Sequence, residues 1–246
     1  MKKPEKKRLD QLLVERGLAE SRHQARAIVL AGMVLVDGGA ADKPGKEVSE
    51  AVSLSLKERP AYVGRGGLKL EAALDGFSID ADGLTFLDAG ASTGGFTDCL
   101  LQRGAARVIA VDVGYGQFHW RLRSDPRVCL LERTNLRFLG PEQLPSAIDA
   151  AVADLSFISL ELVLERIHGF LPPGGRFIPL VKPQFEVGKG LVGKGGVVRD
   201  PSKIREVVDA MKAAAERFGF EVLGELESPV RGPKGNREVF LNLRKI

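Results

Sequence analysis

Apolar residues near the start of the chain recur at helical spacing. Leucines at positions 9, 12 and 13 lie on one side of a helix that we expect to stop at Gly17, because glycine is common just after a helix C-terminus. A second amphipathic helix is predicted between Ser21 and Gly32, and Ser21 with Gln24 has the spacing of a capping box. The chain is therefore expected to begin with two short helices.

An alternating pattern follows these helices. Residues 33–36 alternate as in a strand, Asp37 and Gly38 form a hairpin-type turn, and residues 52–56 alternate again as a returning strand. We expect these elements to form a small α+β domain of residues 1–58. An interdomain linker of residues 59–63 would join it to a second domain, residues 64–246.

In the second domain, short apolar runs alternate with helical segments. The runs lie at 85–88, 108–112, 128–131, 150–154 and 177–182. This alternation predicts a Rossmann-like α/β fold, in which a mostly parallel sheet is covered by helices on both faces. Residues 221–226 and 238–244 form two more strands joined by a Pro- and Gly-rich connection, so we expect them to pair antiparallel at one side of the sheet.

Positive charge is concentrated in the first domain. Residues 1–70 carry 14 Lys and Arg against 9 Asp and Glu, whereas residues 71–246 carry 22 against 23. The polar sides of the two predicted helices hold Arg8, Arg16, Arg22 and Arg26. These arginines are candidates for phosphate contacts, with a solvated surface as the alternative.

The same segment has a recognisable local pattern. Arg8-Leu9-Asp10, Ser21-Arg22 and Lys43-Pro44-Gly45, with the apolar and glycine positions between them, resemble the αL RNA-binding module of the ribosomal-protein S-four type. The resemblance implies that the first domain binds structured RNA.

Composition excludes several other classes of protein. No apolar run approaches the roughly 20 residues that a membrane helix needs. Residues 1–7 are basic but are not followed by the apolar stretch of a secretory signal, so we expect a cytoplasmic protein with no stable membrane association. The 2 cysteines and 3 histidines lack metal-ligand spacing, and no metal is expected.

The first strand of the second domain ends in a glycine-rich loop, residues 88–96. Glycines let a backbone approach a ligand, and the first amides of the next helix are free to bind it. The spacing lacks the G-x-G-x-x-G of dinucleotide enzymes, and the Asp88 carboxylate would repel a pyrophosphate but attract an amino group. This favours S-adenosylmethionine over NAD. The loop residues expected to contact it are Asp88, Gly90, Ser92, Thr93, Gly94, Gly95 and Phe96.

Two residues after later strands complete the expected cofactor site. Asp112 ends the second strand, where an acidic side chain can accept hydrogen bonds from both hydroxyls of a ribose. Asn135 lies just past the third strand and is placed to reach the adenine edge.

Four charged residues are predicted to converge beside the cofactor: Lys69, Asp154, Lys182 and Glu238. The combination suits methylation of a ribose hydroxyl, because that oxygen must lose its proton as it attacks the methyl group. A lysine near a second ammonium can accept or share the proton, while carboxylates orient the lysines. Lys182 is the favoured base, although the sequence leaves the choice of lysine open.

The motifs around these residues resemble the TlyA (haemolysin-A-like) family, whose catalytic domain is similar to that of the FtsJ ribose methyltransferases. The segments that carry the resemblance are 62–69, 88–96, 154–159, 181–188 and 235–238. It implies a class I methyltransferase in which Lys69, Asp154, Lys182 and Glu238 form a catalytic tetrad. It also implies a ribosomal RNA or ribosomal subunit as partner and cytidine 2′-hydroxyls as targets. We also expect Arg65 and Lys189 to contact RNA.

Three alternatives are weighed against this function. A non-catalytic RNA-binding ribosome assembly factor would need only the first domain, and the intact tetrad argues against it. A membrane-active haemolysin would need membrane-spanning elements that the sequence lacks. Methylation of a base carbon is less favoured, because it usually needs a cysteine nucleophile and neither cysteine lies near the crevice. Phe157 and Phe185 are candidates for stacking on a flipped base, with core packing as the alternative.

Overall fold

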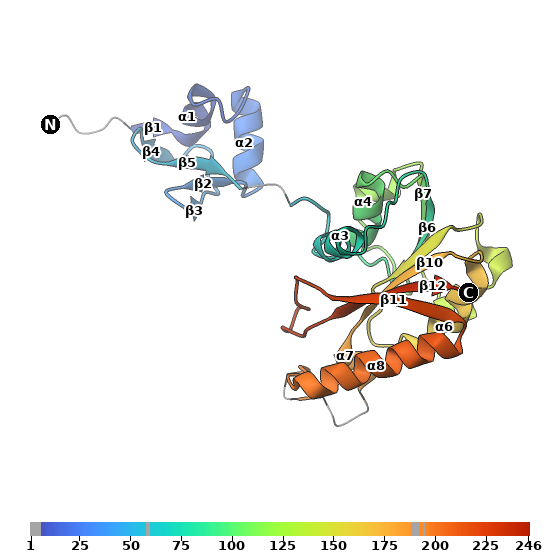
Figure 1. Cartoon of the computed structure of the whole chain (residues 1–246). Helices are drawn as coiled ribbons and strands as arrows, with labels where there is room; N and C mark the ends of the chain where they lie inside the picture. The colour runs from blue at the N-terminus through green and yellow to red at the C-terminus, as the bar shows by residue number, and fades with distance from the viewer. Residues whose placement is uncertain (1–5, 58–59, 188–191, 194) are drawn as a thin grey trace. The chain divides into compact units, whose positions relative to one another are not determined.

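The computed structural model describes residues 6–57, 60–187, 192–193 and 195–246. The chain folds as two units, Met1–Pro60 and Ala61–Ile246 (Figure 1). Each unit has its own apolar core.

Two helices and two small sheets build the first unit. The helices are α1 (Leu9–Glu15) and α2 (Arg22–Leu30). One sheet pairs β1 (Lys6–Arg8) with β4 (Glu47–Ser49), and the other has the order β3 (Gly39–Ala40), β2 (Val34–Val36), β5 (Leu54–Leu56). Buried leucines of α1 pack against the apolar side of α2 and complete the core.

The predicted helix ends and turn of this unit are confirmed. Gly17 and Gly32 have φ angles of 70° and 66°, the left-handed conformation that ends many helices. Asp37 and Gly38 have φ angles of 48° and 81°, as a two-residue type I′ hairpin requires.

Two details of this unit were wrong. The Ser21 hydroxyl accepts from the Gln24 amide at 3.2 Å, but the Gln24 side chain accepts from the amide of Glu20 instead of that of Ser21, so the capping box is incomplete. The strand that returns from the hairpin is β3. The strand predicted at 52–56 forms as β5, which pairs with the other edge of β2.

A seven-stranded sheet forms the centre of the second unit. In spatial order its strands are β11 (Phe220–Glu227), β12 (Val239–Lys245), β10 (Arg176–Val181), β9 (Ala150–Ala153), β6 (Thr85–Ala89), β7 (Arg107–Val111) and β8 (Val128–Leu131). The last five strands in this order are mutually parallel, and β12 pairs antiparallel with both β10 and β11. The predicted sheet and its antiparallel strand pair are therefore confirmed.

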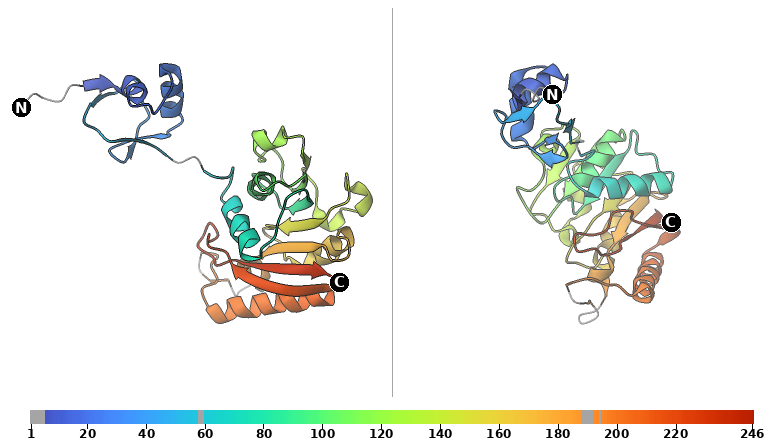
Figure 2. Two further views of the ribbon diagram at one scale, coloured as in Figure 1. Left: turned by 45° about the horizontal axis from the view of Figure 1, so that its top comes forward. Right: turned by 90° about the vertical axis from the view of Figure 1, so that its left-hand side faces the viewer.

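Helices cover both faces of this sheet (Figure 2). One face packs on α3 (Gly66–Gly76) and α4 (Gly95–Gln102), and the other on α6 (Glu161–Phe170) and α8 (Pro201–Arg217). Successive residues of β6 alternate between the two faces, with Phe86 in one core and Leu87 in the other. A short helix, α5 (Trp120–Arg123), precedes β8.

The glycine content of residues 183–200 predicts neither a stable helix nor a strand there, yet part of this segment is regular. Pro183–Glu186 forms one helical turn, α7, and Gly193 makes a bridge to Val197. The expectation of no helix was therefore wrong for the first four residues. Residues 188–191 and 194 lie outside the described part of the chain. In the part that is described, no helix is long and apolar enough to cross a membrane.

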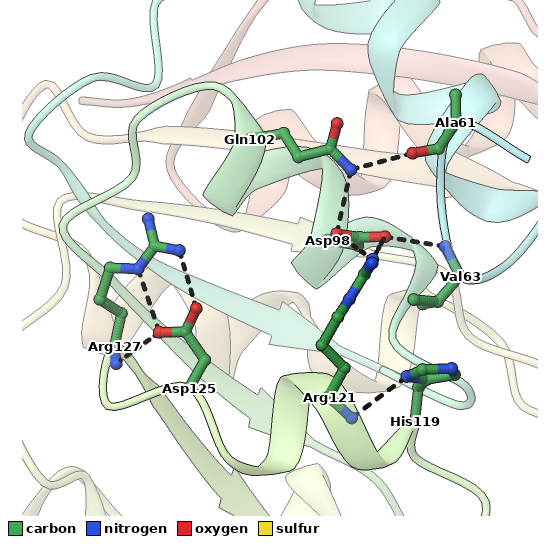
Figure 3. Close-up of polar contacts among 8 residues, drawn as sticks. All are labelled: Ala61, Val63, Asp98, Gln102, His119, Arg121, Asp125 and Arg127. Atoms are coloured by element: carbon green, nitrogen blue, oxygen red, sulfur yellow. Dashed lines mark hydrogen bonds and ion pairs between the residues drawn. The ribbon is translucent and has the colours of Figure 1, made fainter. Parts of the chain in front are cut away.

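The first residues of the second unit are fixed to α4 by a polar cluster (Figure 3). The Asp98 carboxylate accepts from the backbone amide of Val63 at 2.8 Å and from the side chains of Gln102 and Arg121. Gln102 also donates to the carbonyl of Ala61 at 2.9 Å. Asp98 is buried, so these bonds hold the segment before α3 against α4.

Candidate active site

The carboxyl ends of the parallel strands share one edge of the sheet, and a cavity of about 360 Å³ lies there. Gly90, Asp112 and Asn135 line it, together with residues 154–158 after β9. Each of the three follows a different strand, so the parallel topology brings together residues that are distant in sequence.

Asp112 connects two loops at this cavity. Its Oδ2 accepts from the Ser92 amide at 2.7 Å, and its Oδ1 accepts from the Gly114 amide at 2.7 Å and from Gln117 at 3.2 Å. Because a carboxylate oxygen can accept two hydrogen bonds, Oδ2 retains capacity for a ligand hydroxyl. The Asn135 Oδ1 caps the short 3₁₀ helix Leu136–Phe138 by accepting from Arg137, which leaves its amide NH₂ as the available donor.

The glycine loop approaches Asp154 closely. Gly90 has a φ angle of 84°, and a Cβ atom there would lie 2.9 Å from the carbonyl oxygen of Asp154. A side chain at this position would therefore force the two loops apart. Beyond the loop lies a smaller cavity of about 110 Å³, and its lining includes Ser92, Thr93, Gly95 and Phe96.

Asp88 lies beneath the loop and has no solvent exposure. Its Oδ2 accepts from the Thr97 hydroxyl at 2.6 Å, and its Oδ1 has no hydrogen-bond partner among the described residues. Burial, together with the nearby charges of Asp154 and Asp112, raises the pKa of Asp88 to about 7 against the opposing hydrogen bonds of Thr97. Asp88 and Gly94 line none of the cavities at this edge, so the structure places both behind the site surface.

Two ion pairs form beside the glycine loop. Lys69 Nζ on α3 lies 2.5 Å from Glu238 Oε2, and Lys182 Nζ lies 2.5 Å from Asp154 Oδ1. Because β12 runs antiparallel to β10 with Val239 opposite Val181, Glu238 before β12 and Lys182 after β10 lie at the same edge. The structure thus brings the four predicted residues together, with each lysine bound to a carboxylate.

The four residues line one cavity of about 220 Å³. It shares Ser92, Asp154 and Ser156 with the 360 Å³ cavity, so the two are contiguous. Arg65 also lines it and donates to the carbonyl of Arg231 at 3.2 Å. Alternating charges therefore surround a space next to the expected cofactor position.

An aromatic cavity of about 420 Å³ adjoins the ion pairs on the other side. Phe157 and Phe185 line it with Lys182, and their ring centroids lie 5.1 Å apart. Phe157 has a φ angle of 65° and is 91% exposed. A bulky residue in this conformation is unusual and indicates a constrained loop. Phe157 is therefore not a core residue.

Three of the four arginines expected to bind RNA in the first unit contact the protein itself. Arg8 makes two bonds to the fully buried Asp10, and Arg22 donates to the same carboxylate at 3.3 Å. These guanidinium groups, Arg8 most strongly, hold the pKa of Asp10 below its usual range. Arg16 donates to the carbonyls of Val52 and Glu50.

Each of these arginines remains at least partly accessible. The side chains of Arg8 and Arg22 are 44% and 55% exposed, and Arg26 is exposed on α2. Lys189 lies outside the described residues. Within the described part of the chain, no group of three His, Cys, Asp or Glu side chains could hold a metal ion.

Sequence reasoning missed two polar residues at the site. Ser156 accepts from Lys182 Nζ at 2.9 Å and lines all three larger cavities. Glu186, on α7, bonds to the loop after Asp154. Ser156 could have been predicted from the sequence, because it follows Asp154 by two residues in the segment after a strand.

Comparison with known proteins gives two family matches. Residues 62–245 match the model of the FtsJ-like methyltransferases, and residues 7–52 match that of the S4 domain. A protein of Mycobacterium tuberculosis named 16S/23S rRNA (cytidine-2′-O)-methyltransferase TlyA is 52% identical over 96% of this chain and 89% of its own length. Hemolysin A of Brachyspira hyodysenteriae is 37% identical over 94% of this chain and 97% of its own.

A solved structure also matches along nearly the whole chain. It is a Streptococcus thermophilus protein with 43% sequence identity and a TM-score of 0.75, and the match covers 98% of this chain and 89% of that one.

Proposed function

This chain belongs to the FtsJ-like methyltransferase family, and we propose that it methylates the ribose 2′-hydroxyl of cytidine in ribosomal RNA. The supporting observation is the cavity that holds the Lys69–Glu238 and Lys182–Asp154 pairs and shares lining residues with the expected cofactor cavity. The name of the M. tuberculosis relative gives the substrate class.

The residues at the glycine loop fit S-adenosylmethionine. The side-chain-free approach at Gly90 and the carboxylates of Asp112 and Asp154 on the cavity wall support a site for a ligand with a positively charged group. Asp112 would hold the ribose and Asn135 the adenine edge, while Ser92, Thr93, Gly95 and Phe96 line the space for the methionine part. When bound, this cofactor supplies a methyl group on a sulfonium centre.

The chain's own residues would activate the hydroxyl. A 2′-oxygen in the cavity would lie near both lysines, and the positive charge of Lys69 would stabilise the negative charge that develops on it as Lys182 takes the proton. We assign the proton to Lys182 Nζ, which must carry a lone pair to accept it, because both of its partners, Asp154 and Ser156, border the cofactor cavity. The pair of Lys69 with the buried Glu238 would provide a fixed charge behind the reacting oxygen.

The aromatic cavity would receive the target base. Phe157 and Phe185 offer faces on which a base can stack, directly beside Lys182. In this proposal the nucleotide is turned out of its RNA context so that its ribose enters the charged cavity.

The first unit would recruit the RNA. Its S4 domain has accessible positive charges on Arg8, Arg22 and Arg26, which could contact RNA phosphates. Arg65 and Lys189 of the second unit are proposed as further RNA contacts near the reaction.

Mapping of ribose methylation tests this function directly. Ribosomal subunits isolated from cells that lack the protein would be incubated with S-adenosylmethionine and the purified chain. New 2′-O-methylcytidine is expected with the wild type and none with Lys182→Met. RNA binding without any new methyl group would instead support the non-catalytic assembly factor, and methylation of a base would contradict the ribose assignment.

A further inference from the structure

The two loops that carry the Lys182–Asp154 pair leave neighbouring strands. The loop of residues 154–160 follows β9, and α7 follows β10, which pairs in parallel with β9. Besides the Lys182–Asp154 pair, Ser156 connects the two loops by accepting a hydrogen bond from Lys182. A second contact lies farther from the reaction, at Glu186.

Glu186, on the other loop, caps the N-terminus of helix α6. Its Oε2 accepts from the Ser159 hydroxyl at 2.6 Å, and its Oε1 accepts from the Leu160 amide at 2.9 Å. Leu160 is the N-cap residue of α6, and its side chain has no oxygen to bond the free amides. A carboxylate at a helix N-terminus is also favoured by the helix dipole.

The carboxyl group of Glu186 is partly buried for these bonds. Burial raises the pKa of Glu186, and the hydrogen bonds from Leu160 and Ser159 oppose that rise. The ionisable groups that face it are Glu161 on α6 and Lys203 and Glu206 on α8. Glu186 is therefore held by its two donors in an environment that would otherwise disfavour its charge.

The loop that Glu186 fixes is the strained one. Phe157 has its positive φ angle between the contact of Ser156 with Lys182 and the contacts of Ser159 and Leu160 with Glu186. A strained conformation persists only where the surroundings determine it. Without the second contact, the loop would relax and Asp154 would no longer be held against Lys182.

We propose that Glu186 is a positioning residue. It fixes the 154–160 loop and thereby sets the geometry of the Lys182–Asp154 pair and the orientation of Phe157. This role rests on the proposed methyl transfer. Glu186 acts through the loop and does not itself meet the substrate.

Three variants and one control test the role. Glu186→Ala removes both acceptors, Ser159→Ala removes one donor, and Glu186→Gln keeps an acceptor for the Leu160 amide and an amide group for Ser159. Glu206→Gln, an exposed glutamate beside the same small cavity, is the matched control. Methyl transfer would be measured under single-turnover conditions, cofactor binding by calorimetry, and amide exchange of residues 154–160 by mass spectrometry.

We expect Glu186→Ala to lower the rate by about 10- to 100-fold, as misplacement of reacting groups does, with cofactor affinity within about threefold. Ser159→Ala should be intermediate, and Glu186→Gln should recover to within about threefold of the wild type. Amide exchange of the loop should accelerate in Glu186→Ala and not in Glu186→Gln or Glu206→Gln.

Two outcomes would overturn the role. One is a folded Glu186→Ala variant with wild-type rate and exchange. The other is an equal loss in the Ala and Gln variants, which would mean that the charge and not the position matters. If the wild type were inactive but amide exchange of the loop accelerated in Glu186→Ala, the proposed function would be contradicted and the loop contact would still be supported.

Discussion

Replacement of Lys182 by methionine separates catalysis from folding. Methionine keeps most of the apolar stem beside Phe185 but removes the ammonium group that contacts Asp154 and Ser156. Loss of proton transfer alone commonly costs about 10²- to 10⁴-fold in rate. We therefore expect the single-turnover rate to fall by at least about 100-fold.

The stability of this variant should fall much less than its rate. Removal of one partner from a fully buried ion pair costs about 3–5 kcal/mol. The Asp154 side chain is 21% exposed although its Oδ1 is buried, so water can solvate part of the carboxylate that is left, and about 1–3 kcal/mol is expected. Affinity for S-adenosylmethionine should change less than about threefold, because the proposed work of Lys182 is on the attacking oxygen.

The assays are single-turnover methyl transfer, calorimetry of cofactor binding, and unfolding by urea. Lys212→Met is the matched control, because it also breaks contacts of a lysine with carboxylates, those of Asp209 and Glu225, and Lys212 lines none of the cavities at the site. That variant should lose some stability and keep its rate. A folded Lys182→Met protein with at least a third of the wild-type rate would refute the assignment of the proton to Lys182.

Three further variants test the other assignments. Asp112→Ala should weaken cofactor binding about tenfold or more, since a charged hydrogen-bonding group contributes roughly 1.5–3 kcal/mol; unchanged affinity in calorimetry would remove Asp112 from the ribose site. Arg26→Ala should weaken RNA binding and flatten its salt dependence without destabilising the fold, whereas Arg8→Ala should destabilise it by taking a partner from buried Asp10. Equal urea midpoints for those two variants would contradict this difference. Asp88, with a pKa of about 7 when folded, binds its proton more readily in the folded state, so its stabilising contribution is present below about pH 4 and lost as the pH rises to about 7. Asp88→Asn should remove that pH dependence, and parallel unfolding profiles for variant and wild type would argue against it.

The topology of the sheet explains why so much of the site could be predicted. Asp112, Asp154 and Lys182 follow apolar runs whose period and length are local properties of the sequence. Once those runs form parallel strands, their carboxyl ends must share an edge. Glu238 precedes β12, which runs antiparallel to β10, so the amino end of β12 lies at that same edge.

The parts that could not be predicted depend on side-chain partners distant in sequence. The apolar pattern places Asp88 at a strand end, but only the packing of α4 shows that it is fully buried and bonded to Thr97. Arg8 and Arg22 were interpreted as surface charge, because the burial of Asp10 depends on how the whole first unit folds. A charged residue near an anionic partner has no periodic signal that distinguishes phosphate binding from an internal ion pair.

Helix α6 shows where a weak local signal could have been used. Ser159 is the residue that sequence rules would choose to cap this helix, yet its hydroxyl reaches the amide of Glu161 only at 3.3 Å. The N-cap instead lies one residue later, at Leu160, whose amide must find an acceptor elsewhere because a buried donor without a partner is costly. The residues able to supply one are those on the neighbouring loop after β10, and the first carboxylate there is Glu186. A helix start without a local cap, next to a loop that carries catalytic residues, therefore points to a contact that holds the two loops together.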